Sequence, residues 1–173
     1  KSTSWELRRG EFRASSFLVD MNQVFEEFVI TALREELRVG QREFPSNCSH
    51  RTLCMDTAKR IRLKPDISWW DGNQCVFVGD VKYKPINVPG IKHADLYQLL
   101  AYTTATNLPS GLLIYAAGET EPRTHKVRFA DKLLEVTALD LSGSPERILD
   151  QIRELAMQIR TAARSVHKRA IHA

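Results

Sequence analysis

The sequence predicts an α/β domain in which helices cover both faces of a central mixed β-sheet. Apolar residues recur at helical spacing in three segments: residues 17–39, residues 93–106 and the residues after 144. Shorter apolar or alternating segments, typical of strands, lie between them. A chain with this order of elements buries its sheet by packing helices on both faces. The 173 residues are enough for one domain with a sizeable core.

Composition predicts a soluble globular protein of the cytoplasm. Hydrophobic residues make up 43% of the chain and charged residues 27%, a balance that excludes a disordered chain. No apolar run approaches the roughly 18 residues needed to span a membrane, so no membrane partner is expected. The three cysteines lack CxxC spacing and predict neither a disulfide framework nor a zinc site. Because the chain begins with Lys1 and lacks a signal peptide, we expect a single domain over residues 1–173, forming the C-terminal part of a longer protein.

Residues 17–39 are predicted to form an amphipathic helix that ends near Gly40. Its apolar stripe consists of Leu18, Met21, Phe25, Val29, Ala32 and Leu33. Glu26 falls inside the apolar arc, whereas Glu27 lies on the polar side. An inward-facing acid needs a partner, which a metal site in the adjacent sheet would supply. The alternative is an acid at the edge of the stripe that reaches solvent.

Two strands joined by a tight turn are expected after a loop at residues 41–53. The first covers residues 58–70 and the second residues 74–83, with Asp71-Gly72-Asn73 as the turn. Apolar residues occupy both faces of the second strand, with Val76 and Val78 on one and Cys75, Phe77 and Val81 on the other. Such a strand is usually central in its sheet and covered on both sides.

The second half of the chain predicts a helix, three strands and a final helix. The helix covers residues 93–106, and the strands lie at 112–117, 126–129 and 134–139. Ser144 and Pro145 are a typical cap and first residue for the last helix. This helix carries five basic residues and one acid between residues 153 and 169. That surface is either a solvated helix face, a DNA contact or a docking surface for a protein partner.

The sharpest motif is Lys64-Pro65-Asp66, followed 14 residues after Asp66 by Asp80-Val81-Lys82. Residues two apart on a strand share a face, so Asp80 and Lys82 lie together at the end of an otherwise apolar strand. Burying either group costs several kcal/mol unless it is paired or bound to metal. The turn brings Asp66 within about one residue of Asp80, with a bulge needed to put both on one side.

Phosphodiester hydrolysis with Mg²⁺ requires two carboxylates, a lysine and a strand carbonyl. The carbonyl here would be that of Val81. The metal offsets phosphate charge and generates a hydroxide-like nucleophile. Lys82 would hold the attacking water or stabilise charge on phosphate oxygens. The alternative is an Asp80–Lys82 surface pair beside an unrelated Pro-Asp turn, which the short pattern alone does not exclude.

Gln98 and Tyr102 lie four apart on the predicted helix and therefore share a face. Facing the site, they would position DNA phosphates or Lys82. The alternative is an exposed polar pair. Together with Glu26 and the acid–lysine motif, they make a nuclease the favoured interpretation.

These segments resemble a known family. Residues 17–29 (FLVDMNQVFEEFV) resemble the sequence that opens the nuclease domain of McrC proteins, the nuclease subunits of McrBC modification-dependent restriction systems. Residues 63–67 (LKPDI) and 79–84 (GDVKYK) resemble the catalytic core of that domain. Residues 95–102 (DLYQLLAY) resemble its next helix, whose Q-x-x-x-Y pattern is shared with RecB-type nucleases. The resemblance covers roughly residues 17–117.

The resemblance implies a restriction-endonuclease-like fold of the PD-(D/E)xK type and Mg²⁺-dependent cleavage of DNA, with Mn²⁺ as an expected substitute. Asp66 and Asp80 would be metal ligands, Glu26 a further acid at the metal, and Lys82 the catalytic lysine. Gln98 and Tyr102 would assist catalysis. The implied partners are DNA and an McrB-type AAA+ GTPase that recognises modified DNA. Dimerisation on DNA is expected, because cutting both strands needs two such sites.

Two alternatives stay open at this stage. One is another PD-(D/E)xK enzyme, such as a RecB-like or repair exonuclease. The other is a catalytically silent DNA-binding subunit that keeps the fold.

Overall fold

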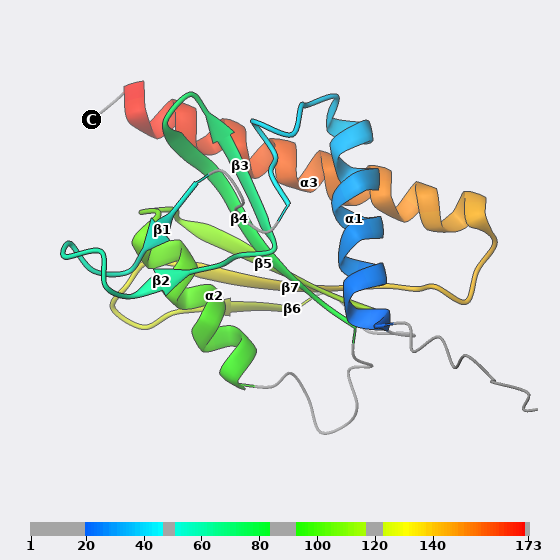
Figure 1. The fold of residues 1–173 in the computed structure, drawn as a ribbon, viewed down its shortest axis with the longest axis horizontal. Coiled ribbons are helices and arrows are strands. Elements are labelled where there is room, and N and C mark those ends of the chain that lie inside the picture. The colour runs from blue at the N-terminus through cyan, green and yellow to red at the C-terminus, as the bar shows by residue number, and fades with distance from the viewer. Residues whose placement is uncertain (1–19, 47–50, 84–92, 117–122, 172–173) are drawn as a thin grey trace, which may run out of the picture.

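A computed structural model of the chain describes residues 20–46, 51–83, 93–116 and 123–171 (Figure 1). The elements in order are α1 (Met21–Leu37), β1 (Leu53–Cys54), β2 (Arg62–Leu63), β3 (Ile67–Asp71), β4 (Gln74–Lys82), α2 (His93–Ala105), β5 (Ser110–Ala116), β6 (Arg123–Lys126), β7 (Leu133–Leu139) and α3 (Pro145–Ile171). In the described part of the chain, none of the helices is both long enough and apolar enough to cross a membrane.

Five strands form a mixed sheet in the order β3-β4-β5-β7-β6. The three inner strands β4, β5 and β7 run parallel, and the edge strands β3 and β6 are antiparallel to their neighbours. Strands β1 and β2 form a separate two-stranded hairpin beside the sheet (Figure 1). The predicted α/β architecture with a mixed sheet is confirmed.

Helices α1 and α3 cover one face of the sheet. Their apolar stripes form one core with strand residues, including Val29, Leu33, Phe77, Ile114 and Ile159. Asp20 caps α1, because its side chain accepts a hydrogen bond from the Asn22 backbone N–H.

Helix α1 ends before the expected Gly40, at Leu37. Arg38 adopts a left-handed conformation with φ 57°. There the backbone N–H groups of Arg38 and Val39 bond to the carbonyls of Glu35 and Arg34, which closes the helix. Residues 17–19 of the predicted helix lie outside the described residues.

Helix α2 covers the opposite face. Leu99 packs against Leu113 and Tyr115, and Tyr102 packs with Cys75 and Val78. The helix approaches β5 closely because Gly111 has no side chain. A Cβ on Gly111 would lie 2.7 Å from Thr103 Cγ2 and 2.8 Å from Leu99 Cδ1.

The prediction of one strand over residues 58–70 was wrong, because this segment contains two short strands, β2 and β3. Pro65 has no N–H to donate to a ladder, and it separates β2 from β3. Residues 58–60 belong to a turn in which Lys59 has φ 56°. The Asp56 side chain accepts from the backbone N–H groups of Arg60 and Ile61, which stabilises this turn. The expected loop at 41–53 also ends differently, since Leu53 begins β1.

The expected faces of the second strand needed one correction. Trp69 pairs with Phe77 and Trp70 with Cys75, so Val76 is an extra residue that forms a β-bulge. Cys75 therefore joins Val78 in the core beneath α2, whereas Phe77 joins the core beneath α1 and α3.

The later elements follow the prediction with one exception. The strand expected at 126–129 is β6, which ends at Lys126. Phe129 is fully exposed and has a left-handed backbone with φ 64°. It lies in a turn that is closed by a hydrogen bond from the Val127 N–H to the Lys132 carbonyl. Helix α2, strands β5 and β7, and the start of α3 at Pro145 lie where they were expected, within about two residues.

Candidate active site

The bulge in β4 places Asp66 and Asp80 side by side. Before the bulge, Asp71 pairs with Gln74, and continuing that register would put Asp66 opposite Gly79. After the bulge, Ile67 pairs with Gly79, so Asp66 lies across from Asp80. Directly opposed residues of antiparallel strands project from the same face. The extra residue therefore moves the Asp66 side chain to the face that carries Asp80.

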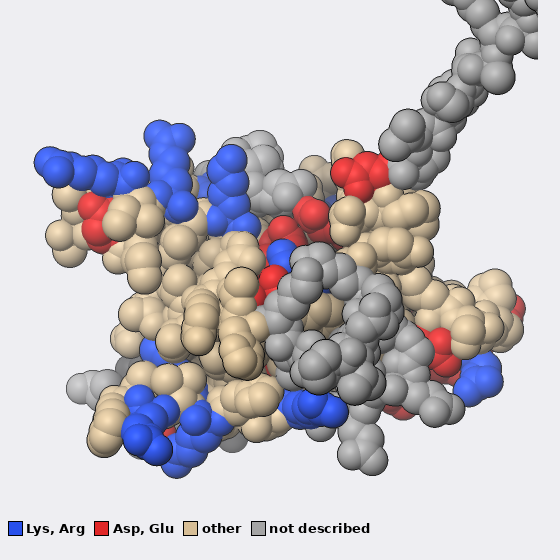
Figure 2. Space-filling view, turned by 90° about the horizontal axis from the view of Figure 1, so that it is seen from below, with Lys and Arg blue, Asp and Glu red and all other residues tan. Residues whose placement is uncertain are grey.

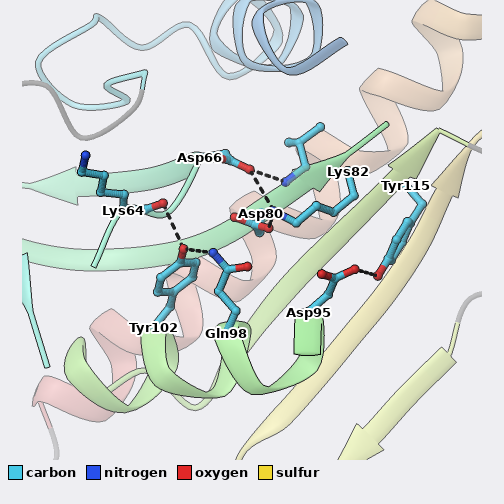
Figure 3. Close-up of polar contacts among 9 residues, drawn as sticks. Lys64, Asp66, Asp80, Lys82, Asp95, Gln98, Tyr102 and Tyr115 are labelled. Carbon is cyan, nitrogen blue, oxygen red and sulfur yellow. Dashed lines mark hydrogen bonds and ion pairs between the residues drawn. The ribbon is translucent and has the colours of Figure 1, made fainter. Parts of the chain in front are cut away.

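Asp66, Asp80 and Lys82 converge at this end of the sheet (Figure 3). The Lys82 ammonium forms an ion pair with Asp80 and lies 3.9 Å from Asp66 Oδ2. The backbone N–H of Val81 donates a 2.9 Å hydrogen bond to the same Asp66 oxygen. Asp66 is thus held by the backbone of the strand that carries the other two groups.

Asp80 is fully buried, while the side chains of Asp66 and Lys82 keep 15% and 20% of their exposure. Within the described residues, Asp80 Oδ1 has no hydrogen-bond partner. A buried carboxylate oxygen without a donor is costly. Of the positively charged groups among the described residues, Lys82 pairs with Asp80.

Burial and the neighbouring Asp66 carboxylate raise the pKa of Asp80 to about 8, although Lys82 opposes them. Burial lowers the pKa of Lys82, but the Asp80 and Asp66 carboxylates outweigh it and the net pKa is raised. Lys82 therefore stays charged, and Asp80 takes up a proton far more readily than an ordinary carboxyl group.

Gln98 and Tyr102 form a chain of hydrogen bonds that ends just before Asp66. Gln98 Nε2 donates to Tyr102 Oη at 2.5 Å, and this hydroxyl donates to the Lys64 carbonyl at 2.9 Å. Tyr102 is buried, and Gln98 is half-buried. The pair is therefore not an exposed polar pair, and it fixes the backbone two residues before Asp66.

Glu26 lies in the first half of α1 and is half-buried. The ring of Phe25, its neighbour, lies 5.8 Å from the ring of Tyr83, the residue after Lys82. The part of α1 that carries Glu26 therefore lies beside the end of β4. Its role as a further acid of the site stays a prediction.

The structure adds two residues that the sequence interpretation missed, Asp95 and Tyr115. Asp95 is a buried acid of α2, and Tyr115 Oη donates a 2.7 Å hydrogen bond to its carboxylate (Figure 3). Burial and this bond raise the pKa of Tyr115, and Asp95 contributes to the raised pKa of Lys82. The sequence held one signal, because Asp95 precedes Gln98 by three residues and Tyr102 by seven, on one helical face.

A family model described as McrBC 5-methylcytosine restriction system component matches residues 1–116. This is more than half of the chain. The chain belongs to this family. The resemblance to McrC seen in the sequence is thereby confirmed.

One solved structure supports the fold of this McrC-family chain. It is described as a refined half-complex from a tetradecameric assembly of Thermococcus gammatolerans McrB AAA+ hexamers with bound McrC. The match has a TM-score of 0.53 and 18% identity, and covers 82% of this chain and 34% of the matched chain. The McrC-family chain thus spans about a third of that protein's length. No curated protein sequence matches it.

The oxygen donors of this McrC-family site suit Mg²⁺. Asp66 and Asp80 supply two carboxylates, the number that Mg²⁺ usually takes from a protein. The buried Asp80 oxygen without a donor fits a bound cation. Among the described residues, no group of three His, Cys, Asp or Glu side chains forms a ready-made metal site. Ligation by Val81 and Glu26 stays a prediction.

Proposed function

We propose that this chain is a metal-dependent deoxyribonuclease that hydrolyses phosphodiester bonds. The observation that carries the proposal is the buried Asp80 carboxylate, which faces Asp66 and is paired with Lys82 at the end of a central strand. A structural ion pair has no need of a second carboxylate, since it adds repulsion where burial is already costly. A nuclease needs two carboxylates because together they bind a divalent cation, which offsets their charge and that of the substrate phosphate.

The proposed site belongs to a restriction-endonuclease-like core of the PD-(D/E)xK type, within one domain over residues 1–173. Asp66, Asp80, the Val81 carbonyl and Glu26 would hold Mg²⁺ or Mn²⁺. The bound metal would supply Lewis-acid activation of water and charge neutralisation. Lys82, which contacts both carboxylates, would orient the attacking water or a phosphate oxygen.

Gln98 and Tyr102 would act on the site through the backbone. Their hydrogen bonds hold the Lys64 carbonyl and so fix the approach of the chain to Asp66. Asp95, held by Tyr115, would add negative charge that keeps Lys82 protonated.

We further propose that the chain is the cleavage subunit of a GTPase-driven complex that restricts DNA with modified cytosine. Family membership supports this, and so does the fold likeness to a structure described as McrB AAA+ hexamers with bound McrC. An McrB-like partner would recognise the modification and deliver the DNA in the cytoplasm.

The test is cleavage of closed circular and linear DNA in Mg²⁺ or Mn²⁺, with and without a candidate GTPase. Asp80→Asn and Lys82→Ala are expected to lower the rate at least a hundredfold, on the order that loss of a principal catalytic group produces. Cleavage of circular DNA distinguishes an endonuclease from an exonuclease of the same fold. DNA binding without cleavage under all conditions would identify a silent subunit, and undiminished cleavage by both variants would refute the proposed site.

A further inference from the structure

Residues 51–64 form a strongly basic hairpin beside the candidate site. Leu53 pairs with Leu63 and Cys54 with Arg62, and a turn joins the two strands. The segment contains five basic residues, Arg51, Lys59, Arg60, Arg62 and Lys64. Its single acid is Asp56. We call residues 51–64 the basic hairpin.

Most of the basic side chains of the hairpin make no ion pair with the described residues of the fold. Lys59, Arg60, Arg62 and Lys64 are exposed. Within the described residues, no carboxylate lies at ion-pair distance from any of these four. Arg51 alone has a structural role, with its guanidinium 4.7 Å from the centre of the Trp70 ring.

The single acid of the hairpin, Asp56, shapes its turn through hydrogen bonds to the backbone. It accepts hydrogen bonds from the N–H groups of Arg60 at 2.9 Å and Ile61 at 2.7 Å. These bonds shape the turn that carries Lys59 and Arg60. Asp56 offsets only one of the five positive charges, so the hairpin keeps a net charge of +4 (five basic residues minus one acid).

The basic hairpin is attached firmly to the site. Its last residue, Lys64, is two residues before Asp66, and its carbonyl accepts the Tyr102 hydrogen bond. The Lys64 side chain extends away from Tyr102 (Figure 3). Figure 2 shows acidic side chains gathered near the middle of one face, with basic side chains projecting at its edges.

We propose that the basic hairpin binds the phosphate backbone of DNA next to the bond that is cut. This inference rests on the proposed nuclease function and adds a DNA-positioning surface to it. Exposed cations on a rigid turn neutralise phosphates without reading sequence, and each contact releases counterions from DNA. The carboxylates of the site repel DNA, so a neighbouring cationic surface is needed to hold the substrate against them.

The test compares two double variants that each remove two exposed charges from the 173-residue chain. Arg60→Ala/Arg62→Ala alters the hairpin, and the matched control Arg123→Ala/Lys126→Ala alters β6 at the opposite edge of the sheet. Both are made in an Asp80→Asn background, and duplex DNA binding is measured by fluorescence anisotropy from low to moderate salt. The hairpin variant is expected to reduce the slope of log K against log salt by about 2, and to weaken binding roughly tenfold to a hundredfold at about 0.1 M salt. The control is expected to bind like the background.

Equal losses in both double variants, or no loss in the hairpin variant, would overturn the inference. Loss of binding to a GTPase partner with DNA affinity unchanged would also overturn it, since the hairpin would then dock a protein. These outcomes do not depend on cleavage. A chain that never cleaves DNA but loses affinity as predicted would refute the nuclease proposal and leave the hairpin as a DNA contact.

Discussion

Asp80 is a fully buried carboxylate that faces a second carboxylate and an ammonium group. In the absence of a cation the least costly state keeps a proton on Asp80, because burial and Asp66 both disfavour its charge. In the proposed nuclease, a proton and the metal ion would therefore compete for Asp80.

Replacing Asp80 by Asn should stabilise the metal-free fold increasingly as pH rises. The folded pKa is raised from 3.8 to about 8. Neutral Asp80 therefore contributes its full stability below about pH 4, and that contribution is lost as pH rises through about 8. Urea unfolding with a chelator should show Asp80→Asn gaining about 4 kcal/mol in stability relative to the parent between about pH 5 and pH 8, at about 1.4 kcal/mol per pH unit. Parallel pH profiles for the two proteins would contradict the raised pKa.

Metal binding should release a proton at neutral pH. A cation binds the ionised carboxylate, so Asp80 must lose its proton when Mg²⁺ or Mn²⁺ enters. Calorimetry at about pH 6.5 in buffers of different ionisation enthalpy should report about one proton released per metal. Above about pH 9 the release should disappear, and Asp80→Asn should bind the metal weakly. A buffer-independent heat at pH 6.5 would exclude Asp80 as the ligand that titrates.

Helix α2 contributes to the geometry of the site from the face of the sheet that carries Val78, Asp80 and Lys82. It carries Asp95, Gln98 and Tyr102 on one side, and its packing on β5 and β4 brings all three toward the site. The hydrogen bond from Tyr102 to Lys64 then connects the helix to the segment before Asp66.

Removing the Tyr102 hydroxyl should affect both stability and catalysis. Tyr102→Phe leaves the Lys64 carbonyl without this donor and should cost about 1–3 kcal/mol in urea unfolding. The turnover rate should fall about tenfold with little change in DNA affinity, because Asp66 loses its fixed approach. Gln98→Ala keeps the Tyr102–Lys64 bond and is expected to lose less. Equal losses of stability and turnover in Tyr102→Phe and Gln98→Ala would show that the Tyr102–Lys64 hydrogen bond is not the more important of the two.

The close approach of α2 to β5 depends on Gly111. Gly111→Ala should destabilise the fold by about 1–3 kcal/mol, since the new methyl group meets Thr103 and Leu99 below 3 Å. Gly40→Ala is the matched control, because its nearest atom would lie 3.7 Å away. Thermal unfolding of the two variants compares them directly. A Gly111 variant as stable as the control would show that α2 can move away without cost.

At the scale of the whole molecule, the described residues contain one Asp66–Asp80–Lys82 site, at the antiparallel edge of the sheet formed by β3 and β4. The basic hairpin lies next to this edge, while β6 forms the other edge. In the proposed nuclease, one such site would hydrolyse one strand of a duplex, so we expect double-strand cleavage to need two chains.

Circular DNA should therefore be nicked before it is linearised. At low protein concentration nicked circles should accumulate, and linear product should rise more steeply than in proportion to protein concentration. Gel analysis of a time course over a range of protein concentrations measures both. Direct linearisation at every concentration would indicate a preformed pair of sites, and proportional growth of linear product would contradict dimerisation on DNA.

Much of this molecule follows from local patterns. Helical periodicity located α1, α2 and α3, and the Ser144-Pro145 pair located the start of α3. Period-two alternation put Asp80 and Lys82 on one face without any knowledge of the neighbouring strands. The strands predicted at 58–70 and 126–129 were placed wrongly. Pro65 interrupts the first strand, and Phe129, with its left-handed backbone, lies beyond the end of the second. The alternation of apolar residues continues through both positions and so did not reveal these ends.

The sequence by itself determined the α/β class, the family and the spacing of Asp66, Asp80 and Lys82. Only the tertiary structure decided that Asp66 lies opposite Asp80, because one extra residue at Val76 shifts the register and turns every later side chain to the other face. The same holds for Asp95 with Tyr115 and for Tyr102 with Lys64, pairs separated by 20 and 38 residues. Contacts of that range depend on how helix and sheet pack together, which no local periodicity encodes.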